Sequence, residues 1–176
     1  MTNNIIITGF GGQGVLFAGK ILATTALIKG KYLSWLPSYG PEMRGGAANC
    51  HVIISDEPVG SPIIINPDIL LTMNKPSMDK FEDSVVPGGT IIYDKTLIDR
   101  DVKRDDVKSV AVDATKIATT QAKANMANMI MLGALLKATN IFTLEEISEG
   151  VKKAVPASKQ EMAEYNIKLI EKGYNL

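Results

Sequence analysis

A glycine-rich turn near the N-terminus constrains the fold of this chain more than any other feature of its sequence. The turn has the spacing G-x-G-x-x-G and consists of Gly9, Phe10, Gly11, Gly12, Gln13 and Gly14. A β-branched run over residues 4–8 precedes it, and small or apolar residues follow at helical spacing over 15–29, closed by Gly30. A strand, a tight turn and a helix in this order predict the start of a Rossmann-like unit.

The glycine turn is also a candidate binding site. Glycines let the backbone turn sharply and approach a ligand, while the free N–H groups and the dipole at the start of the next helix favour negative charge. We therefore expect an anionic group such as a phosphate to bind at Gly9, Gly11, Gly12, Gln13 and Gly14. The alternative is that these glycines only allow the strand and the helix to pack tightly.

The residues after the turn narrow the choice of ligand. A site for NAD requires an acidic residue about 20 positions further on, to hold the adenosine ribose. The first acidic residue here is Glu42, and Lys29 and Lys31 occupy the expected region instead. NAD is therefore disfavoured, whereas NADP or another phosphorylated ligand stays open. Val15 follows Gly14 where a Walker motif has lysine, so the turn is not a P-loop.

The rest of the chain predicts an α/β domain. Further β-branched runs predict strands at 32–36, 49–55, 63–65, 69–73, 90–93 and 109–112. Helical patterns cover 76–84, 114–139, the region opened by a capping box at Thr143 and Glu146, and 159–172. The charged stretch 95–108 is expected to be mostly exposed. We predict a single domain over residues 1–176, with a three-layer, Rossmann-like, mostly parallel sheet and an α-rich C-terminal part.

Composition excludes several functions. The chain has 19 basic and 19 acidic residues, so no net charge attracts it to nucleic acid or to anionic membranes. Its longest early apolar run is too short for a signal peptide or a membrane span, which favours a cytoplasmic protein. Cys50 is the only cysteine and His51 the only histidine, so this chain can ligate neither an iron–sulfur cluster nor a multi-histidine metal site. Both are expected in or near the core.

A second loop combines rigid and flexible residues with charge. Two prolines stiffen its start, and it then offers the carboxylate of Glu42, the guanidinium of Arg44 and the flexible pair Gly45 and Gly46. Arginine beside glycines is suited to bidentate recognition of a phosphate or a carboxylate, with Glu42 orienting it or pairing across an interface. The alternative is an ordinary ion pair between Glu42 and Arg44 on a surface loop.

Together the two loops resemble a known family. The glycine turn and the segment Tyr39-Gly40-Pro41-Glu42-Met43-Arg44-Gly45-Gly46 resemble the gamma subunit, or gamma domain, of the pyruvate, 2-oxoglutarate and 2-ketoisovalerate:ferredoxin oxidoreductases. Later matches are Asn128-Met129-Ile130, Leu132-Gly133-Ala134-Leu135, Asn166 and Gly173. The resemblance covers nearly the whole chain.

The resemblance implies an accessory role in the coenzyme A-dependent oxidative decarboxylation of a 2-oxoacid to an acyl-CoA. The type would be 2-oxoglutarate, branched-chain or pyruvate. In this family thiamine diphosphate, magnesium and iron–sulfur clusters lie on partner chains, here alpha, beta and ferredoxin-like delta subunits. The gamma unit would help to bind coenzyme A and to assemble the complex, with no catalytic residue, no metal ligand and no activity of its own. The rival interpretations are a free-standing NADP- or flavin-linked oxidoreductase and a purely structural adaptor.

Overall fold

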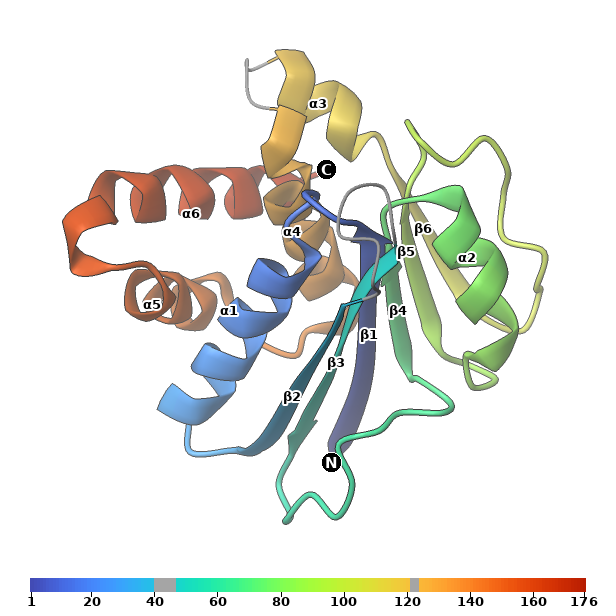
Figure 1. The fold of residues 1–176 in the computed structure, drawn as a ribbon, viewed down its shortest axis with the longest axis horizontal. Helices are drawn as coiled ribbons and strands as arrows, with labels where there is room; N and C mark the ends of the chain where they lie inside the picture. Colours follow the sequence, from blue (N-terminus) through green and yellow to red (C-terminus); the bar gives the residue numbers. More distant parts are fainter. Residues whose placement is uncertain (40–46, 121–123) are drawn as a thin grey trace.

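The computed structural model describes residues 1–39, 47–120 and 124–176, and in them a single six-stranded sheet forms the centre of the molecule (Figure 1). The strands, in the spatial order β2-β3-β1-β4-β5-β6, are β1 Thr2–Phe10, β2 Tyr32–Tyr39, β3 Ala47–Ser55, β4 Ile69–Thr72, β5 Thr90–Asp94 and β6 Lys108–Val112. β1, β4, β5 and β6 pair in parallel, while β3 is antiparallel to both of its neighbours. β3 alone therefore runs against the other five strands, and the predicted mostly parallel sheet is confirmed.

Helices cover the two faces of the sheet unequally. They are α1 Val15–Ile28, α2 Lys75–Phe81, α3 Ala114–Thr120, α4 Ala127–Thr139, α5 Leu144–Ala154 and α6 Gln160–Tyr174. A large core joins one face of the sheet to residues of α1, α3, α4, α5 and α6. A smaller core on the other face contains Ile6, Ile53, Leu70 and Ile91, packed against Phe81 at the end of α2 and irregular segments. The three layers and the α-rich C-terminal part are as predicted.

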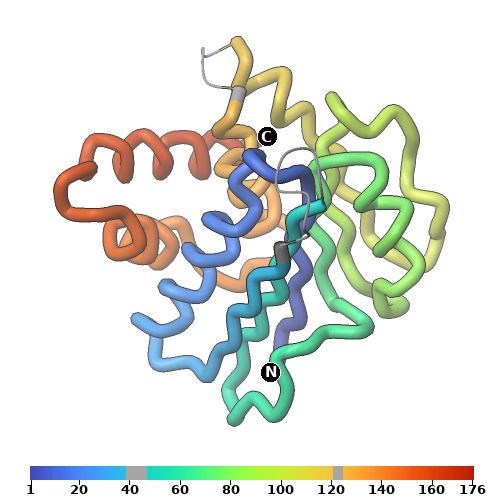
Figure 2. The backbone as a smooth tube through the Cα atoms, viewed as in Figure 1, coloured from blue at the N-terminus to red at the C-terminus, as the bar shows by residue number. Residues whose placement is uncertain are grey.

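The C-terminal helices return to the start of the chain. Figure 2 follows the tube from the blue N-terminal strand to the red helix α6, which packs along α4, while α5 packs against α1. The carboxyl ends of β1, β2, β4 and β5 lie together at the edge of the sheet where α1 begins (Figure 1). Residues that are far apart in the sequence therefore meet beside the glycine turn.

The stretch 63–65 was predicted as a strand and is not one. Pro62 and Pro67 flank it, and proline cannot donate to a strand ladder. Ile64 is buried in the smaller core, and its backbone N–H donates to Nδ1 of His51 at 3.0 Å. The neighbouring isoleucines, 63 and 65, are exposed. The run is thus a loop that one buried side chain and one hydrogen bond hold against the sheet.

The charged stretch 95–108 is mostly exposed, as expected, but it is tied to the body of the protein, most notably at Glu82. Nη2 of Arg100 lies 2.6 Å from Oε2 of Glu82, a carboxylate that is almost completely buried. A buried carboxylate is costly without such a partner. The ion pair holds this stretch beside the end of α2, on the face of the sheet that carries the smaller core.

Two glycines let α4 and α6 cross at close range. A Cβ added at Gly133 would lie 2.0 Å from the backbone oxygen of Ile170, and one added at Gly173 would lie 1.9 Å from that of Ile130. Backbone atoms cannot move aside as a flexible side chain can. The crossing therefore fixes α6 relative to α4.

Replacing Gly133 with alanine should therefore destabilise the fold. We expect the variant to lose about 1 to 3 kcal/mol of unfolding free energy, because the methyl group forces the two helices apart. Urea denaturation measures the change. Gly60→Ala is the matched control, since a Cβ at Gly60 meets nothing within 4 Å, and its change should stay within about 0.5 kcal/mol. Equal stability of the two variants would contradict the close crossing.

Candidate ligand-binding site

The glycine turn joins the end of β1 to the start of α1 in a conformation that depends on glycine. Gly12 has φ 94° and Gly14, the residue that caps α1, has φ 74°. Residues with a Cβ rarely adopt such values. No side chain caps α1 at Gly14, and its first turn contains no acidic residue. The first N–H groups of a helix have no partner inside the helix, so this end offers donors and a positive dipole to a ligand.

Gln13 fixes the shape of the turn from within. Its Oε1 accepts a hydrogen bond from the backbone N–H of Phe10 at 2.6 Å, and its Nε2 donates to the backbone oxygen of Met73 at 3.2 Å. The Gln13 side chain thus connects the turn to the residue that follows β4. Gly9 leaves room for this amide, because a Cβ there would lie 2.5 Å from Oε1. Any effect of Gln13 on a ligand therefore passes through the shape of the turn.

Asn128 fixes the turn from the opposite side. Its Nδ2 donates to the backbone oxygen of Gly14 at 3.0 Å, across 114 positions of sequence. The same oxygen accepts the first intrahelical bond of α1, from the N–H of Ala18 at 3.1 Å. Asn128 lies in the first turn of α4 and is almost completely buried. The starts of α1 and α4 are therefore joined at one carbonyl group.

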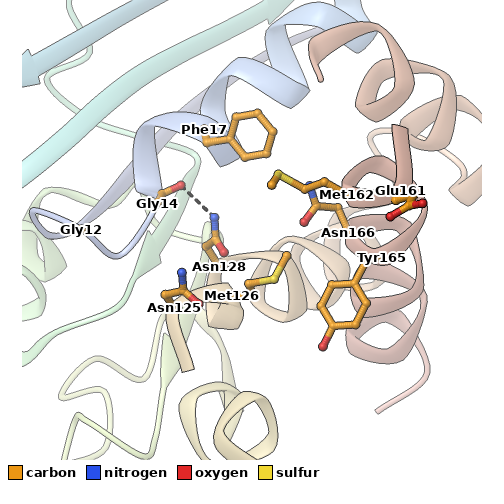
Figure 3. A pocket seen from close by; sticks show the side chains of 10 residues that line it. All are labelled: Gly12, Gly14, Phe17, Asn125, Met126, Asn128, Glu161, Met162, Tyr165 and Asn166. Carbon is orange, nitrogen blue, oxygen red and sulfur yellow. Dashed lines mark hydrogen bonds between the residues drawn. The ribbon is translucent and has the colours of Figure 1, made fainter. Parts of the chain in front are cut away.

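A pocket of about 610 Å³ opens beside this junction, between α1, the start of α4 and α6 (Figure 3). The glycine turn contributes Gly12 and Gly14 to its wall. Its apolar and aromatic side chains are Phe17, Met126, Met162 and Tyr165, and its polar side chains are Asn125, Asn128, Asn166 and Glu161. The pocket thus combines apolar walls with side-chain amides and, among the described lining residues, a single carboxylate. Sequence reasoning did not assign Phe17, Glu161 or Tyr165 to a site, because no local pattern links α1 to α6.

The second loop predicted as part of the site is only partly accessible to description. Glu42, Arg44, Gly45 and Gly46 lie outside the described residues, and so does the side chain of Tyr39. The strands on either side locate its two attachment points: Tyr39 pairs with Ala48, and Ala47 pairs with Phe10 of the glycine turn. Both ends of the segment 40–46 are therefore next to the turn.

Lys29 and Lys31, the two lysines that kept NADP as a possible ligand, form ion pairs with carboxylates of the same chain. Nζ of Lys29 lies 3.2 Å from Oε1 of Glu146, and Nζ of Lys31 pairs with Asp56. Helix α1 begins at the glycine turn and is about 21 Å long, and Lys29 follows its last residue. Both lysines are thus neutralised by carboxylates at the far end of that helix. This arrangement gives no support to recognition of a ribose phosphate there.

Cys50 and His51 belong to the packing of the sheet. Cys50 is completely buried, and burial raises the pKa of its thiol to about 12, so it is unreactive at neutral pH. His51 is half-buried, and burial lowers its pKa. Trp35 lies against the same region, where a Cβ at Gly19 would meet Cys50 Sγ at 2.4 Å and Trp35 Nε1 at 3.1 Å. Gly19 thus allows α1 to pack closely on the sheet.

The described residues form neither a metal site nor a membrane span of the usual kinds. No group of three or more histidine, cysteine, aspartate or glutamate side chains there could hold a metal ion. No helix in that part of the chain is both long and apolar enough to cross a membrane.

The fold and the turn together define a Rossmann-like α/β domain whose candidate site lies at the carboxyl edge of its sheet. Comparison with known proteins specifies the domain further. The family model described as pyruvate ferredoxin/flavodoxin oxidoreductase matches residues 4–176. The chain therefore belongs to this family, and the resemblance noted from its two loops is confirmed.

Individual relatives agree with this assignment. The chain is 41% identical to the ketoisovalerate oxidoreductase subunit VorA of Methanothermobacter thermautotrophicus, over 95% of this chain and 35% of VorA. It thus spans about a third of that relative. It is 38% identical to the 2-oxoglutarate synthase subunit KorC of Methanocaldococcus jannaschii, over 100% of this chain and 94% of KorC. The crystal structure of a keto/oxoacid ferredoxin oxidoreductase gamma subunit from Geobacter sulfurreducens superposes with a TM-score of 0.82 at 30% identity, covering 98% of this chain and 96% of that one.

The internal role of Gln13 leads to a stability prediction. Gln13→Glu keeps the acceptor for Phe10 but replaces the donor to Met73 with a carboxylate oxygen. At neutral pH we expect a loss of about 1 to 3 kcal/mol of unfolding free energy, because two acceptors then face each other. Gln160→Glu is the matched control, since that exposed amide makes only a long 3.4 Å contact to Pro156. If thermal or urea unfolding finds no difference between the variants, Gln13 does not hold the turn.

Proposed function

We propose that this chain is the gamma-type unit of a 2-oxoacid:ferredoxin oxidoreductase and contributes to coenzyme A binding and to assembly of the complex. The complex would convert a 2-oxoacid and coenzyme A to an acyl-CoA and carbon dioxide, passing electrons to ferredoxin. Alpha, beta and delta subunits would carry thiamine diphosphate, magnesium and the iron–sulfur clusters. The observation that carries the proposal is the open start of α1 at a glycine turn beside a partly apolar pocket.

The residues present fit this division of labour. An iron–sulfur cluster needs several cysteine thiolates, and the sole cysteine is buried in the sheet core. Coenzyme A, in contrast, carries phosphates together with an uncharged arm and an uncharged base. The glycine turn suits the phosphates, since it presents N–H donors and the positive end of a helix dipole. The pocket beside it suits an uncharged part of the same molecule.

The oxoacid is proposed only as a class. The two relatives described above are named for ketoisovalerate and for 2-oxoglutarate. We infer a branched-chain or 2-oxoglutarate substrate, bound mainly by the partner subunits. The rival of a purely structural adaptor differs in one respect, because an adaptor needs no ligand at the glycine turn.

Gly12 provides the test of ligand binding. A Cβ at Gly12 would meet nothing within 4 Å, so a substitution there faces open space while its backbone keeps φ 94°. Gly12→Ala should weaken coenzyme A binding by at least about tenfold, because the methyl group and the relaxed backbone disturb the N–H groups that face the anion. Isothermal titration of coenzyme A into the purified chain and into the assembled complex measures this.

The control for Gly12→Ala carries the same conformational strain elsewhere. Gly88 has φ 78°, also with nothing within 4 Å, and lies in the turn before β5 at the opposite edge of the sheet. Alanine costs about 1 to 2 kcal/mol at either position. Gly88→Ala should therefore lose similar stability while binding coenzyme A normally. If Gly12→Ala also binds normally, the glycines serve strand–helix packing alone, and the adaptor interpretation gains.

Arg44 provides a second test, in the complex. We propose that its guanidinium contacts a phosphate of coenzyme A or a carboxylate of a partner chain. Arg44→Ala should raise the Michaelis constant for coenzyme A roughly 10- to 100-fold, since a charge-assisted bidentate contact is lost. Arg44→Lys should rescue it poorly, because lysine keeps the charge but not the planar fork. Loss of subunits on gel filtration would assign Arg44 to an interface instead, and parental behaviour of both variants would make it a surface residue.

A further inference from the structure

Asn166 is a buried residue whose side-chain amide lines the pocket beside the glycine turn. It lies in α6 with 2% of its surface exposed. Its side chain makes no hydrogen bond with any residue in the described ranges. Figure 3 shows it pointing from α6 into the pocket beside the glycine turn. Its amide atoms are not among the fully enclosed unpaired polar atoms of the described residues, so they reach the pocket, where a ligand or water can be their partner.

The surrounding residues make this position unusual. The other buried residues of α6 are Ala163, Leu169, Ile170 and Gly173, which face the core without polar groups. Asn128, on the same pocket wall, donates a hydrogen bond from its Nδ2 to the carbonyl oxygen of Gly14. Of the two buried amides in the pocket, Asn166 is therefore the one for which no hydrogen bond to a described residue fixes its orientation.

The charge of the wall restricts what Asn166 can meet. No lysine or arginine occurs among the described residues that line the pocket, and Glu161 is its only carboxylate. An anionic group is thus disfavoured beside Asn166. Phe17 and Met162 border the same space in Figure 3 and suit a flat or aliphatic uncharged group.

We propose that Asn166 is a ligand-recognition residue, whose amide pairs with an uncharged group that offers a hydrogen-bond donor next to an acceptor. The edge of adenine and a secondary amide of the pantetheine arm both have this chemistry, and coenzyme A contains both. The inference rests on the proposed coenzyme A function and deepens it. The phosphates bind at the glycine turn, and the uncharged group enters the pocket between α1, α4 and α6.

The experiment titrates coenzyme A, adenosine and pantetheine separately into the purified 176-residue chain, by calorimetry and by ligand-observed NMR. Asn166→Leu removes the amide at similar volume, and Asn166→Ser removes it without adding bulk. Asn175→Leu is the control, because that exposed amide near the end of the same helix bonds only to Glu171. We expect both Asn166 variants to bind coenzyme A at least tenfold more weakly, and to lose whichever small probe occupies the pocket. The melting temperature of Asn166→Leu should stay level or rise.

Each outcome decides the inference. Loss of adenosine binding identifies the base as the occupant, and loss of pantetheine binding identifies the arm. If coenzyme A binding depends on Gly12 but neither Asn166 variant changes it, the proposed function stands and the inference is overturned. The same titrations are made with the assembled complex, because the proposed site is shared with partner subunits. If a small probe binds through Asn166 but Gly12→Ala leaves coenzyme A binding by the complex unchanged, the pocket stands and the proposed function fails. If Gly12→Ala and both Asn166 variants leave coenzyme A binding by the complex unchanged, both are overturned.

Discussion

One backbone carbonyl group, that of Gly14, holds together the end of this molecule where the candidate site lies. It accepts the first hydrogen bond of α1 and the side-chain amide of Asn128 from α4. Two helices from opposite halves of the sequence are thereby fixed to one atom, with Gln13 connecting the same turn to the end of β4. The pocket exists because α6 is in turn held against α4 by the crossing of Gly133 and Gly173. A change at any of these contacts alters the space in which a ligand would bind.

The site separates two kinds of recognition over a short distance. The start of α1 presents N–H donors and a positive dipole, which suit phosphate. The pocket presents amides and apolar walls, with a carboxylate as its only charged group among the described residues. Lys29 and Lys31, the two lysines that had left NADP open, are already paired beyond the other end of α1. The arrangement favours a ligand that is charged at one end and uncharged at the other.

Much of the fold followed from local patterns. The strand, turn and helix at the N-terminus, the capping box at Thr143 and the parallel core strands all appear as predicted. The prediction of a strand at 63–65 was wrong. Its β-branched residues are typical of a strand, but proline has no N–H to donate to a neighbouring strand, and prolines lie on both sides of the run. Within the candidate site, the spacing of the glycines was enough to predict the turn. Glu42 and Arg44 remain predictions, because they lie outside the described residues. Asn128 and Asn166 were named only as part of the family resemblance. An asparagine among apolar helical residues nevertheless indicates a buried polar side chain that needs a hydrogen-bond partner.

The sequence by itself determined where glycine must occur and that one cysteine cannot build a cluster, since these are properties of residue type, spacing and count that hold before the chain folds. Its two loop motifs also carried the resemblance to the family that comparison then confirmed. Only the tertiary structure decided that Gln13 is used inside the turn, that the two lysines are neutralised, and that an amide from α6 faces the turn. Hydrogen bonds and ion pairs across 25 to 117 positions, or their absence, carry no periodic trace in the sequence. They arise when the α4–α6 crossing and the sheet order bring distant residues to one edge.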